Sequence, residues 1–418
     1  MEYIIVAAAA VAVVFLVQAG MPGHVARRAV WILLLAFAAR LVIHVLLIRD
    51  GVLPYGWDNR IYEQRALDIV DYWDRMGIQF VTSDQIGTLY SVAVPCNVFA
   101  FVIYLCGGPA PLACTAVVAL IACALCIVMY RFARLIGADE RAAYRLLVLT
   151  AFMPAFLVHT SDMFKDGFNV FLVLTCLGLA ASNVRKFDVR KLLLLAPLLW
   201  ALWNVRPYMV FMCALPLLLG FVGARRALPL CSLAILAGSL AFVVFFPGAA
   251  QDMALGTLRE QIEQGQSEAV RQANASQDSG VLFDDGGNPY GALAPKLVYT
   301  LLSPFPWTGG SLLLQLGKVE TLVWYYLLFS GVRGARDLWR NGRRALMIIL
   351  LFVIPATIAY ATSMSNIGLI FRQRMPIVMV VSLLAAVAWT RASRSSGQAR
   401  PGTPPLPSPV PVPAGERR

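Results

Sequence analysis

The sequence has little charge for its length. Of its 418 residues only 14% are charged and 59% are hydrophobic, and the mean hydropathy is +0.70. A typical soluble chain is about 25% charged and roughly 45–50% apolar. The chain therefore lacks the polar surface that a soluble enzyme needs and the low hydrophobicity of a disordered protein. Both classes are excluded, and lipid must be part of its solvent.

Several catalytic motifs are also missing. The chain has no Walker phosphate loop, no dinucleotide-binding glycine fingerprint and no HExxH, and only three histidines. ATP-driven transport, dinucleotide-dependent redox chemistry and zinc proteolysis therefore lack their parts. The eight cysteines lie in apolar or juxtamembrane runs and none falls within 247–318. We predict packing residues rather than a disulfide framework.

What the chain does have is long apolar runs. A membrane-spanning helix needs about 20 mostly apolar residues. The first apolar run is preceded by Glu2 and by no Lys or Arg, which predicts a retained helix rather than a cleavable signal peptide. The predicted fold class is all-α, a polytopic membrane protein of about 11 transmembrane helices over 1–391, followed by a disordered Pro-rich cytoplasmic tail at 392–418. The predicted spans lie near 2–20, 29–48, 112–130, 143–159, 165–182, 191–205, 208–222, 227–246, 319–335, 345–362 and 375–391.

Charge predicts the orientation. The apolar run at 89–106 contains Pro95 and Asn97, and we interpret it as a helix lying on the outer face. The inner segments then hold 22 basic and 5 acidic residues, a net charge of +17, and all other segments hold 13 basic and 18 acidic residues, a net charge of −5. This asymmetry follows the positive-inside rule, which places loops 49–111 and 247–318 outside and the C-terminus inside. The inner segments are 21–28, 131–145, 183–191, 223–226, 333–344 and 391–418.

Because the basic residues are spread over topological loops, we expect no nucleic-acid partner. The intramembrane residues Arg40 and His44 are four apart on one helix face and must point inward. We interpret His44 as a structural partner rather than a catalyst.

Two outer-face clusters contain carboxylates. Asp58 follows an aromatic segment, Pro54 to Trp57, and is a candidate to accept a proton from an incoming hydroxyl, or else it begins a solvated loop. Asp162, Lys165 and Asp166 lie within a short outer turn. The two aspartates share a face if the following helix begins early, and then a divalent cation such as Mg²⁺ or Mn²⁺ is a candidate ligand, although no cofactor is certain. The alternative is an ordinary helix N-terminus, where Asp is favoured.

Two further clusters contain arginine. Arg206 occupies a short outer turn, and Arg372 and Arg374 lie on the predicted outer side, against the charge trend. A guanidinium matches phosphate oxygens with two parallel hydrogen bonds, which favours a lipid-linked phosphate or pyrophosphate. Contact with anionic lipid head groups is the alternative.

In its layout the chain resembles the GT-C superfamily, whose members are multispan glycosyltransferases of the protein mannosyltransferase and aminoarabinose transferase kind. The elements that carry the resemblance run from about 29 to 391: Trp57-Asp58 with Tyr62, a juxtamembrane helix ending at Gly107-Gly108, the acidic turn at 161–167, and Arg372-Gln-Arg374-Met-Pro376.

The resemblance implies transfer of a sugar from a polyprenyl-phosphate donor to an envelope glycan or glycolipid acceptor on the periplasmic face of a bacterial inner membrane. Asp58 would be the general base and Asp162 or Asp166 the second-loop carboxylate. Phosphate contacts would come from Lys165, Arg206, Arg372 and Arg374.

Two alternatives stay open. An oligosaccharide repeat-unit polymerase or ligase also has many spans and outer arginines, but no carboxylate base of this kind. A lipid-linked glycan flippase is the other alternative, although the sparse intramembrane charge disfavours it.

Overall fold

A computed structural model describes residues 1–49, 58–186, 188–221, 292–307, 312–362 and 367–398. Within these ranges the chain is helical and contains no strand. The predicted all-α class is therefore confirmed for the described part of the chain. The predicted span at 227–246, most of the loop at 247–318 and the residues 399–418 of the predicted tail lie outside it. The last helix continues to Gln398, past the predicted boundary at 391.

The N-terminal half contains eight α-helices and a π-helical turn at His44–Arg49. The helices are α1 (Glu2–Gly20), α2 (Gly23–Ile43), α3 (Asp58–Met76), α4 (Ala93–Cys106), α5 (Pro111–Ile136), α6 (Glu140–Phe152), α7 (Pro154–Val158) and α8 (Asp166–Arg185). The remaining described helices are α9 (Val189–Trp203), α10 (Pro207–Phe221), α15 (Leu293–Leu302), α16 (Leu312–Asn341), α17 (Arg343–Thr362) and α18 (Ile367–Gln398).

Six helices in the described ranges are long and apolar enough to cross a membrane. The count of about 11 spans is therefore not confirmed, although ten of the predicted runs do coincide with helical segments. One of those helices is simply short: α9 has 15 residues, or about 22 Å of rise against a hydrocarbon core of about 30 Å. The six candidates are Glu2–Gly20, Gly23–Leu46, Pro111–Ile136, Asp166–Arg185, Arg343–Thr362 and Arg372–Thr390.

The predicted span at 143–159 is interrupted by a proline. Helix α6 ends at Phe152, Met153 takes an extended conformation (φ −63°, ψ 122°), and the five-residue α7 starts at Pro154. The ring of a proline disfavours helical backbone at the residue before it, which explains the break. The helix predicted at 89–106 is observed as the 14-residue α4, and its place on the outer face stays a prediction.

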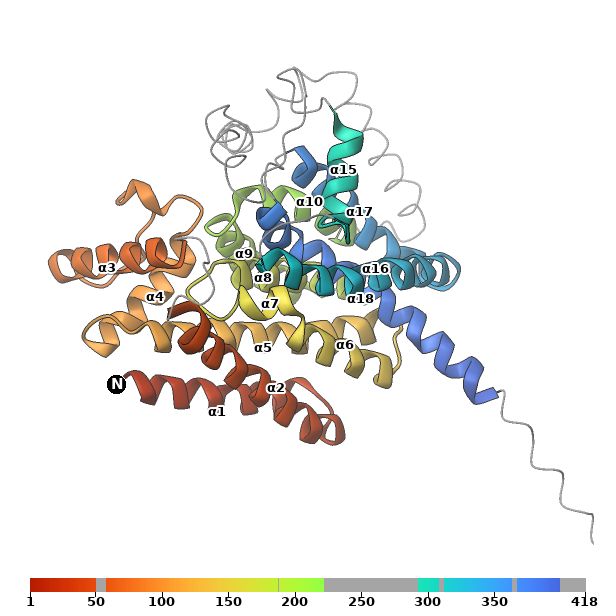
Figure 1. Cartoon of the computed structure of the whole chain (residues 1–418), viewed down its shortest axis with the longest axis horizontal. Helices are drawn as coiled ribbons and strands as arrows, with labels where there is room; N and C mark the ends of the chain where they lie inside the picture. The colour runs from red at the N-terminus through yellow and green to blue at the C-terminus, as the bar shows by residue number, and fades with distance from the viewer. Residues whose placement is uncertain (50–57, 187, 222–291, 308–311, 363–366, 399–418) are drawn as a thin grey trace, which may run out of the picture.

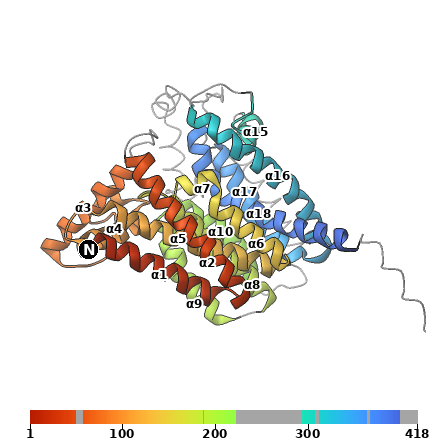
Figure 2. The ribbon, with the colours of Figure 1, turned by 60° about the horizontal axis from the view of Figure 1, so that its bottom comes forward.

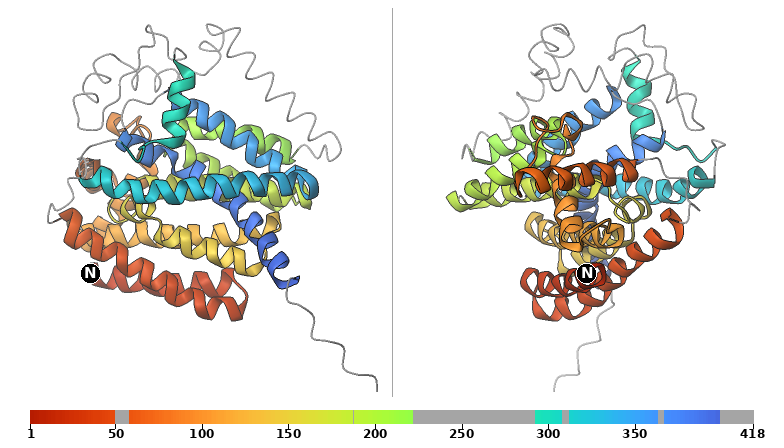
Figure 3. Two further views of the ribbon diagram at one scale, coloured as in Figure 1. Left: turned by 45° about the vertical axis from the view of Figure 1, so that its right-hand side comes forward. Right: turned by 90° about the vertical axis from the view of Figure 1, so that its left-hand side faces the viewer.

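The long helices run side by side, and α5 lies among them (Figures 1 and 3). It contacts α1, α2, α6 and α8, and its small buried residues allow close packing on several sides. Pro111 begins α5, where a missing N–H costs nothing, and Gly137 ends it with φ +114°, a conformation that suits glycine. Helix α5 thus forms the centre on which the other helices are placed.

Helices α16 and α18 approach each other most closely at a glycine. A Cβ atom built on Gly334 would lie 1.8 Å from the carbonyl oxygen of Leu384, so only glycine fits there. One turn earlier, a Cβ on Gly331 would lie 2.9 Å from the side chain of Val381. Small residues at such a spacing allow two backbones to touch, as in many membrane helix pairs.

Helices α3 and α4 pack on each other at one end of the bundle, the end that holds the N-terminus (Figure 2). The buried side of α3 is formed by Tyr62, Ala66, Ile69 and Trp73, spaced as one helix face. The indole of Trp73 donates a hydrogen bond of 2.7 Å to the carbonyl of Gln79, which fixes the exit from α3. These contacts hold α3 against α4.

A buried ion cluster as candidate functional site

Four helix ends bring four charged side chains together. Asp58 begins α3, Asp166 begins α8, Arg206 precedes α10, and Arg372 lies in the second turn of α18. One oxygen of Asp166, Oδ1, accepts a hydrogen bond from Nη2 of Arg206 at 2.7 Å, and the other, Oδ2, accepts one from Nε of Arg372 at 3.0 Å. Nη1 of Arg372 donates to Oδ2 of Asp58. We call these four residues the ion cluster.

Exposure differs sharply across the ion cluster. The side chain of Asp166 is 1% exposed and that of Arg206 8%, whereas Arg372 is 16% and Asp58 40% exposed. Two cations and two anions balance each other, which is what allows charge to lie inside an apolar bundle. Asp166 is thus closed to solvent, and Asp58 is the carboxylate that solvent and ligands can reach.

Lys165 lies beside the ion cluster and has a different partner. Its Nζ donates to the carbonyl of Ser91 at 3.1 Å and lies 3.4 Å from the Ser91 hydroxyl. Burial, together with repulsion from Arg206, lowers the pKa of Lys165 to about 7. This amine therefore changes charge near neutral pH. Burial lowers the pKa of Arg206, but the interaction with Tyr208 and the charge of Asp166 raise it well above its ordinary value, so this arginine keeps its charge.

Asp58 and Lys165 line one cavity of about 490 Å³. Tyr62, Arg65 and Ser91 line it as well. Burial and the charge of Asp58 raise the pKa of Tyr62, so its hydroxyl stays protonated and remains a hydrogen-bond donor. The volume lies in the range of pockets that hold small ligands. The cavity presents a carboxylate, an amine and a phenol to one bound molecule.

Asp162 belongs to a second network, behind the ion cluster. It is fully buried, accepts a 2.7 Å hydrogen bond from Nδ2 of Asn59, and lies 3.4 Å from Nδ1 of His44. Burial alone would raise the pKa of Asp162, but the hydrogen bonds to His44 and Asn59 lower it. Asn59 is next to Asp58 in α3, so this network fixes the first turn of α3. The structure therefore places Asp162 where it holds the site rather than lines it.

Arg40 extends the same network along α2. Its Nε donates to Oγ1 of Thr160 at 2.7 Å, and its guanidinium lies 5.3 Å from the ring centre of Phe156. The sequence prediction that Arg40 and His44 point inward on one face of the helix is confirmed, because both are buried. His44 also lies 3.1 Å from the hydroxyl of Thr115 in α5.

Arg374 is separated from the ion cluster. Its Nη1 donates to the carbonyl of Ser303 at 2.8 Å and to that of Leu301 at 3.3 Å, at the C-terminal end of α15. Its guanidinium lies 5.4 Å from the ring centre of Trp324. Residues two apart in a helix point about 200° apart, which is why Arg372 and Arg374 have different surroundings. Sequence analysis placed both arginines in one phosphate site, whereas the structure gives them different partners.

The two aspartates of the turn at 161–167 are separated as well. Helix α8 begins at Asp166, so Asp162 lies outside it and the two carboxylates do not share a helix face. Their oxygens are hydrogen-bonded to different partners. Across the described ranges, no group of three or more His, Cys, Asp or Glu side chains is placed to hold a metal ion.

Of the predicted site residues, the structure thus joins Asp58, Asp166, Arg206 and Arg372, with Lys165 beside them, while Trp57 lies outside the described residues. Sequence reasoning missed the aromatic and imidazole groups around Arg372. Its guanidinium lies 5.7 Å from the ring centre of Phe164, and the ring of His159 packs against Phe164 at 6.3 Å. Burial and the charge of Arg372 lower the pKa of His159 to about 4, so this imidazole is neutral at pH 7. The position of His159 directly before the acidic turn at 161–167 could have indicated from the sequence that it belongs to the site.

No family model, no curated protein and no solved structure matches the chain.

Proposed function

We propose that this protein is a membrane glycosyltransferase that moves a sugar from a polyprenyl-phosphate donor to a glycan or glycolipid acceptor. The observation that carries the proposal is the double contact of Arg372, which joins the sealed Asp166 to the exposed Asp58. A phosphate that binds Arg372 takes the place of Asp58. The carboxylate released by this exchange is then available as a base next to the bound donor.

The chemistry needs a base for the acceptor and positive charge for the departing phosphate. Asp58 and Lys165 line the cavity, and Arg372 contacts Asp58. Asp58 takes the proton of the acceptor hydroxyl, the acceptor oxygen bonds to the anomeric carbon of the sugar, and the bond from that carbon to the phosphate oxygen breaks. The electron pair leaves with the polyprenyl phosphate. Arg372 and Lys165 stabilise the charge that develops on the departing oxygen. Because phosphate is anionic before and after transfer, only the added charge accelerates the step.

The apolar helices support a lipid-linked donor. Six helices are long and apolar enough to lie in a bilayer, so a polyprenyl chain has an apolar phase beside the cavity. A donor of this kind also has a good leaving group and needs no nucleotide. This agrees with the lack of nucleotide-binding motifs in the sequence.

The test compares two isosteric substitutions in α3. Asp58→Asn removes the proposed base, and Asp74→Asn is a matched control on the exposed face of the same helix. Each variant is expressed in a strain that lacks the gene, and the envelope glycans and lipid-linked intermediates are analysed by mass spectrometry. We expect Asp58→Asn to accumulate the lipid-linked donor while Asp74→Asn restores the glycan. Full restoration by Asp58→Asn would overturn the assignment of the base.

One observation favours the polymerase or ligase alternative, namely that Arg206 and Arg372 both bind Asp166. An arginine pair supports transfer of a whole lipid-linked oligosaccharide without a carboxylate base. In that case Arg206→Lys and Arg372→Lys abolish activity while Asp58→Asn retains it. The masses of the accumulated intermediates separate the two functions, because a polymerase leaves single repeat units and a sugar transferase leaves acceptors that lack one sugar.

A further inference from the structure

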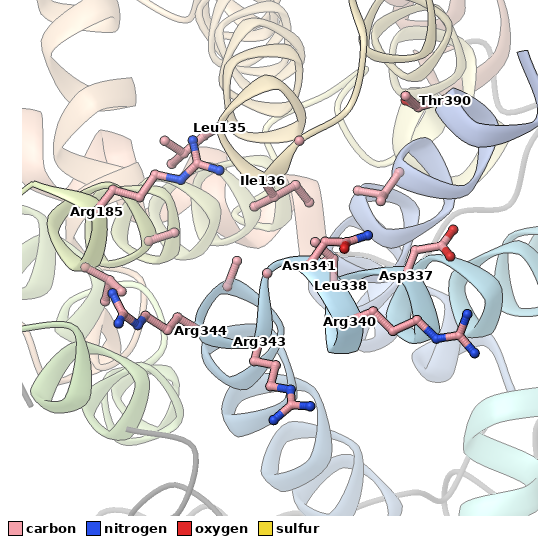
Figure 4. A pocket seen from close by; sticks show the side chains of 16 residues that line it. Leu135, Ile136, Arg185, Asp337, Leu338, Arg340, Asn341, Arg343, Arg344 and Thr390 are labelled. Atoms are coloured by element: carbon pink, nitrogen blue, oxygen red, sulfur yellow. The ribbon is translucent and has the colours of Figure 1, made fainter. Parts of the chain in front are cut away.

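A second cavity lies at the opposite ends of α8 and α18. It has a volume of about 1260 Å³ and is bounded by the ends of α5, α8 and α16, the start of α17, and α18 near Thr390 (Figure 4). Asp166 begins α8 and Arg185 ends it, and 20 helical residues rise about 30 Å. The cavity is therefore separate from the ion cluster, and nothing in the proposed transfer reaction uses it.

The rim of this cavity is cationic. Four arginines line it, against the single carboxylate of Asp337. Nε of Arg343 donates to the carbonyl of Trp339 at 2.8 Å. Within the described ranges, none of the four arginines forms an ion pair with a carboxylate. The rim therefore holds positive charge that is not neutralised. The four residues are Arg185, Arg340, Arg343 and Arg344.

The start of α17 adds to this positive potential. Helix α17 begins at Arg343, directly after Gly342, and the first intrahelical acceptor is the carbonyl of Gly342, bonded by the N–H of Ala345 at 3.0 Å. The helix dipole makes this end of α17 positive. Backbone and side chains thus favour an anion at the same place.

The wall of the cavity is apolar. Leu135 and Ile136 at the end of α5, Val184 in α8, Leu338 in α16 and Val387 in α18 form it. Ile136 and Leu338 are each only 4% exposed, so the apolar surface open to a ligand comes mainly from Leu135 and Val387, which are partly buried. A compact, fully hydrated anion gains nothing from such a wall, whereas an amphiphile buries its apolar part against it. Together with the cationic rim, this apolar surface gives the cavity the two chemistries of an anionic lipid.

The positions of the arginines also favour a bulky ligand. They are spread around the rim on three helices and do not converge on one point (Figure 4). A site for one small inorganic ion holds its donors within a single coordination distance. A phospholipid head group, with a phosphate and a polar substituent, contacts charges that are further apart.

We propose that this cavity binds an anionic phospholipid, with the phosphate of the head group at the arginines and an acyl chain against the apolar wall. The lipid occupies the space where the ends of α5, α8, α16 and α18 meet, and its bound phosphate neutralises the charged rim. The membrane, and not the transfer reaction, supplies this ligand, so its binding is independent of the proposed enzymatic activity.

The test measures lipid binding by the full-length protein. The variant Arg185→Gln/Arg344→Gln removes two rim charges, and Arg27→Gln/Arg28→Gln removes two exposed charges at the start of α2, which do not line the cavity. Each protein is purified in neutral detergent and titrated with phosphatidylglycerol or phosphatidylcholine, and retained lipid is counted by native mass spectrometry. Inorganic phosphate and glycerol 3-phosphate are added in separate arms as soluble competitors.

We expect the wild type and the Arg27/Arg28 variant to retain phosphatidylglycerol in preference to phosphatidylcholine. The rim variant should bind it about thirtyfold more weakly, because each of the two lost cations contributes about 1 kcal/mol near an anionic head group. The soluble phosphates should not displace the lipid. Equal weakening by the two double variants would overturn the proposal, since it would reduce the effect to general surface charge. Displacement by inorganic phosphate would overturn it too, because the ligand would then be a free anion.

Discussion

Arg372 and Asp166 are 206 residues apart in the chain, yet the guanidinium and the carboxylate are in contact at 3.0 Å. This contact ties the start of α8 to the start of α18. Because Asp166 also binds Arg206, the loop before α10 is held at the same point. One buried carboxylate therefore fixes three segments, and several predictions depend on it.

The first prediction is that Asp166→Asn strongly destabilises the protein. The substitution leaves Arg206 and Arg372 with one carboxylate between them inside an apolar bundle, and removing one partner of a buried ion pair costs roughly 3–5 kcal/mol. The measurement is thermal unfolding in detergent. The exposed control Asp74→Asn should unfold at the wild-type temperature. An unchanged midpoint for Asp166→Asn would show that water already screens this pair.

A pH effect is expected from Lys165. Its pKa of about 7 means that the free protein loses this charge as the pH rises through 7. A bound phosphate favours the charged amine, so binding takes up a proton and the affinity falls as the pH increases above about 7. We expect this trend for inorganic pyrophosphate measured by calorimetry, with proton uptake visible in buffers of different ionisation enthalpy. Lys165→Arg, which stays charged, should bind with little dependence on pH over the same range.

The stability of the folded state should also depend on pH through Lys165. The pKa of Lys165 is lowered from the ordinary value of 10.5 in the unfolded chain, so between about 7 and 10.5 the unfolded chain binds the extra proton. Its contribution to stability is full above 10.5 and is lost as the pH falls toward 7. The slope of unfolding temperature against pH should therefore be less positive for Lys165→Met than for the wild type in this window.

Arg372 and Arg374 should give opposite phenotypes when each is changed to lysine. Lysine cannot reproduce the fork with which Arg372 joins two carboxylates, so transfer should fail while the folded protein remains. Arg374 holds carbonyls at the end of α15, and each hydrogen bond is worth about 1 kcal/mol. Arg374→Lys should lower the unfolding temperature and leave transfer per folded molecule unchanged. A loss of specific activity in both variants would place the two arginines in one site.

The predicted orientation is open to labelling. Asp74 in α3 and Asn341 at the end of α16 are both exposed, and charge places them on opposite sides of the membrane. We expect Asp74→Cys to react with a membrane-impermeant maleimide in intact spheroplasts, and Asn341→Cys to react only after permeabilisation. The native cysteines in the described ranges give little background because six of the seven are buried. Labelling of both positions from outside would exclude this topology.

Much of the helical architecture was predictable from apolar runs, but the lengths were not. The run at 143–159 is mostly apolar, and the preference of Pro154 for an extended preceding residue divides it. Helix α3 was treated as a loop because its acidic residues mask the spacing of Tyr62, Ala66, Ile69 and Trp73. That helical spacing was present in the sequence.

For the candidate site, sequence identified the residue types but not their pairings. Asp58, Asp166 and Arg372 were candidates because charge is rare at such positions. Which charge meets which depends on the packing of helices that are distant in sequence, and no local pattern specifies it. The separation of Arg372 from Arg374 is the exception, since the helical repeat alone places residues two apart on different faces.

The glycine at 334 has a mechanical consequence. With the backbone of α16 against that of α18, no side chain lies between them to absorb a displacement by changing rotamer. The two helices must therefore move together as one rigid unit. This unit carries Arg372 near one end and borders the arginine-lined cavity at the other. A single added methyl group at Gly334 would separate the backbones of α16 and α18. It is therefore the smallest change that would disturb both the position of Arg372 and the arginine-lined cavity.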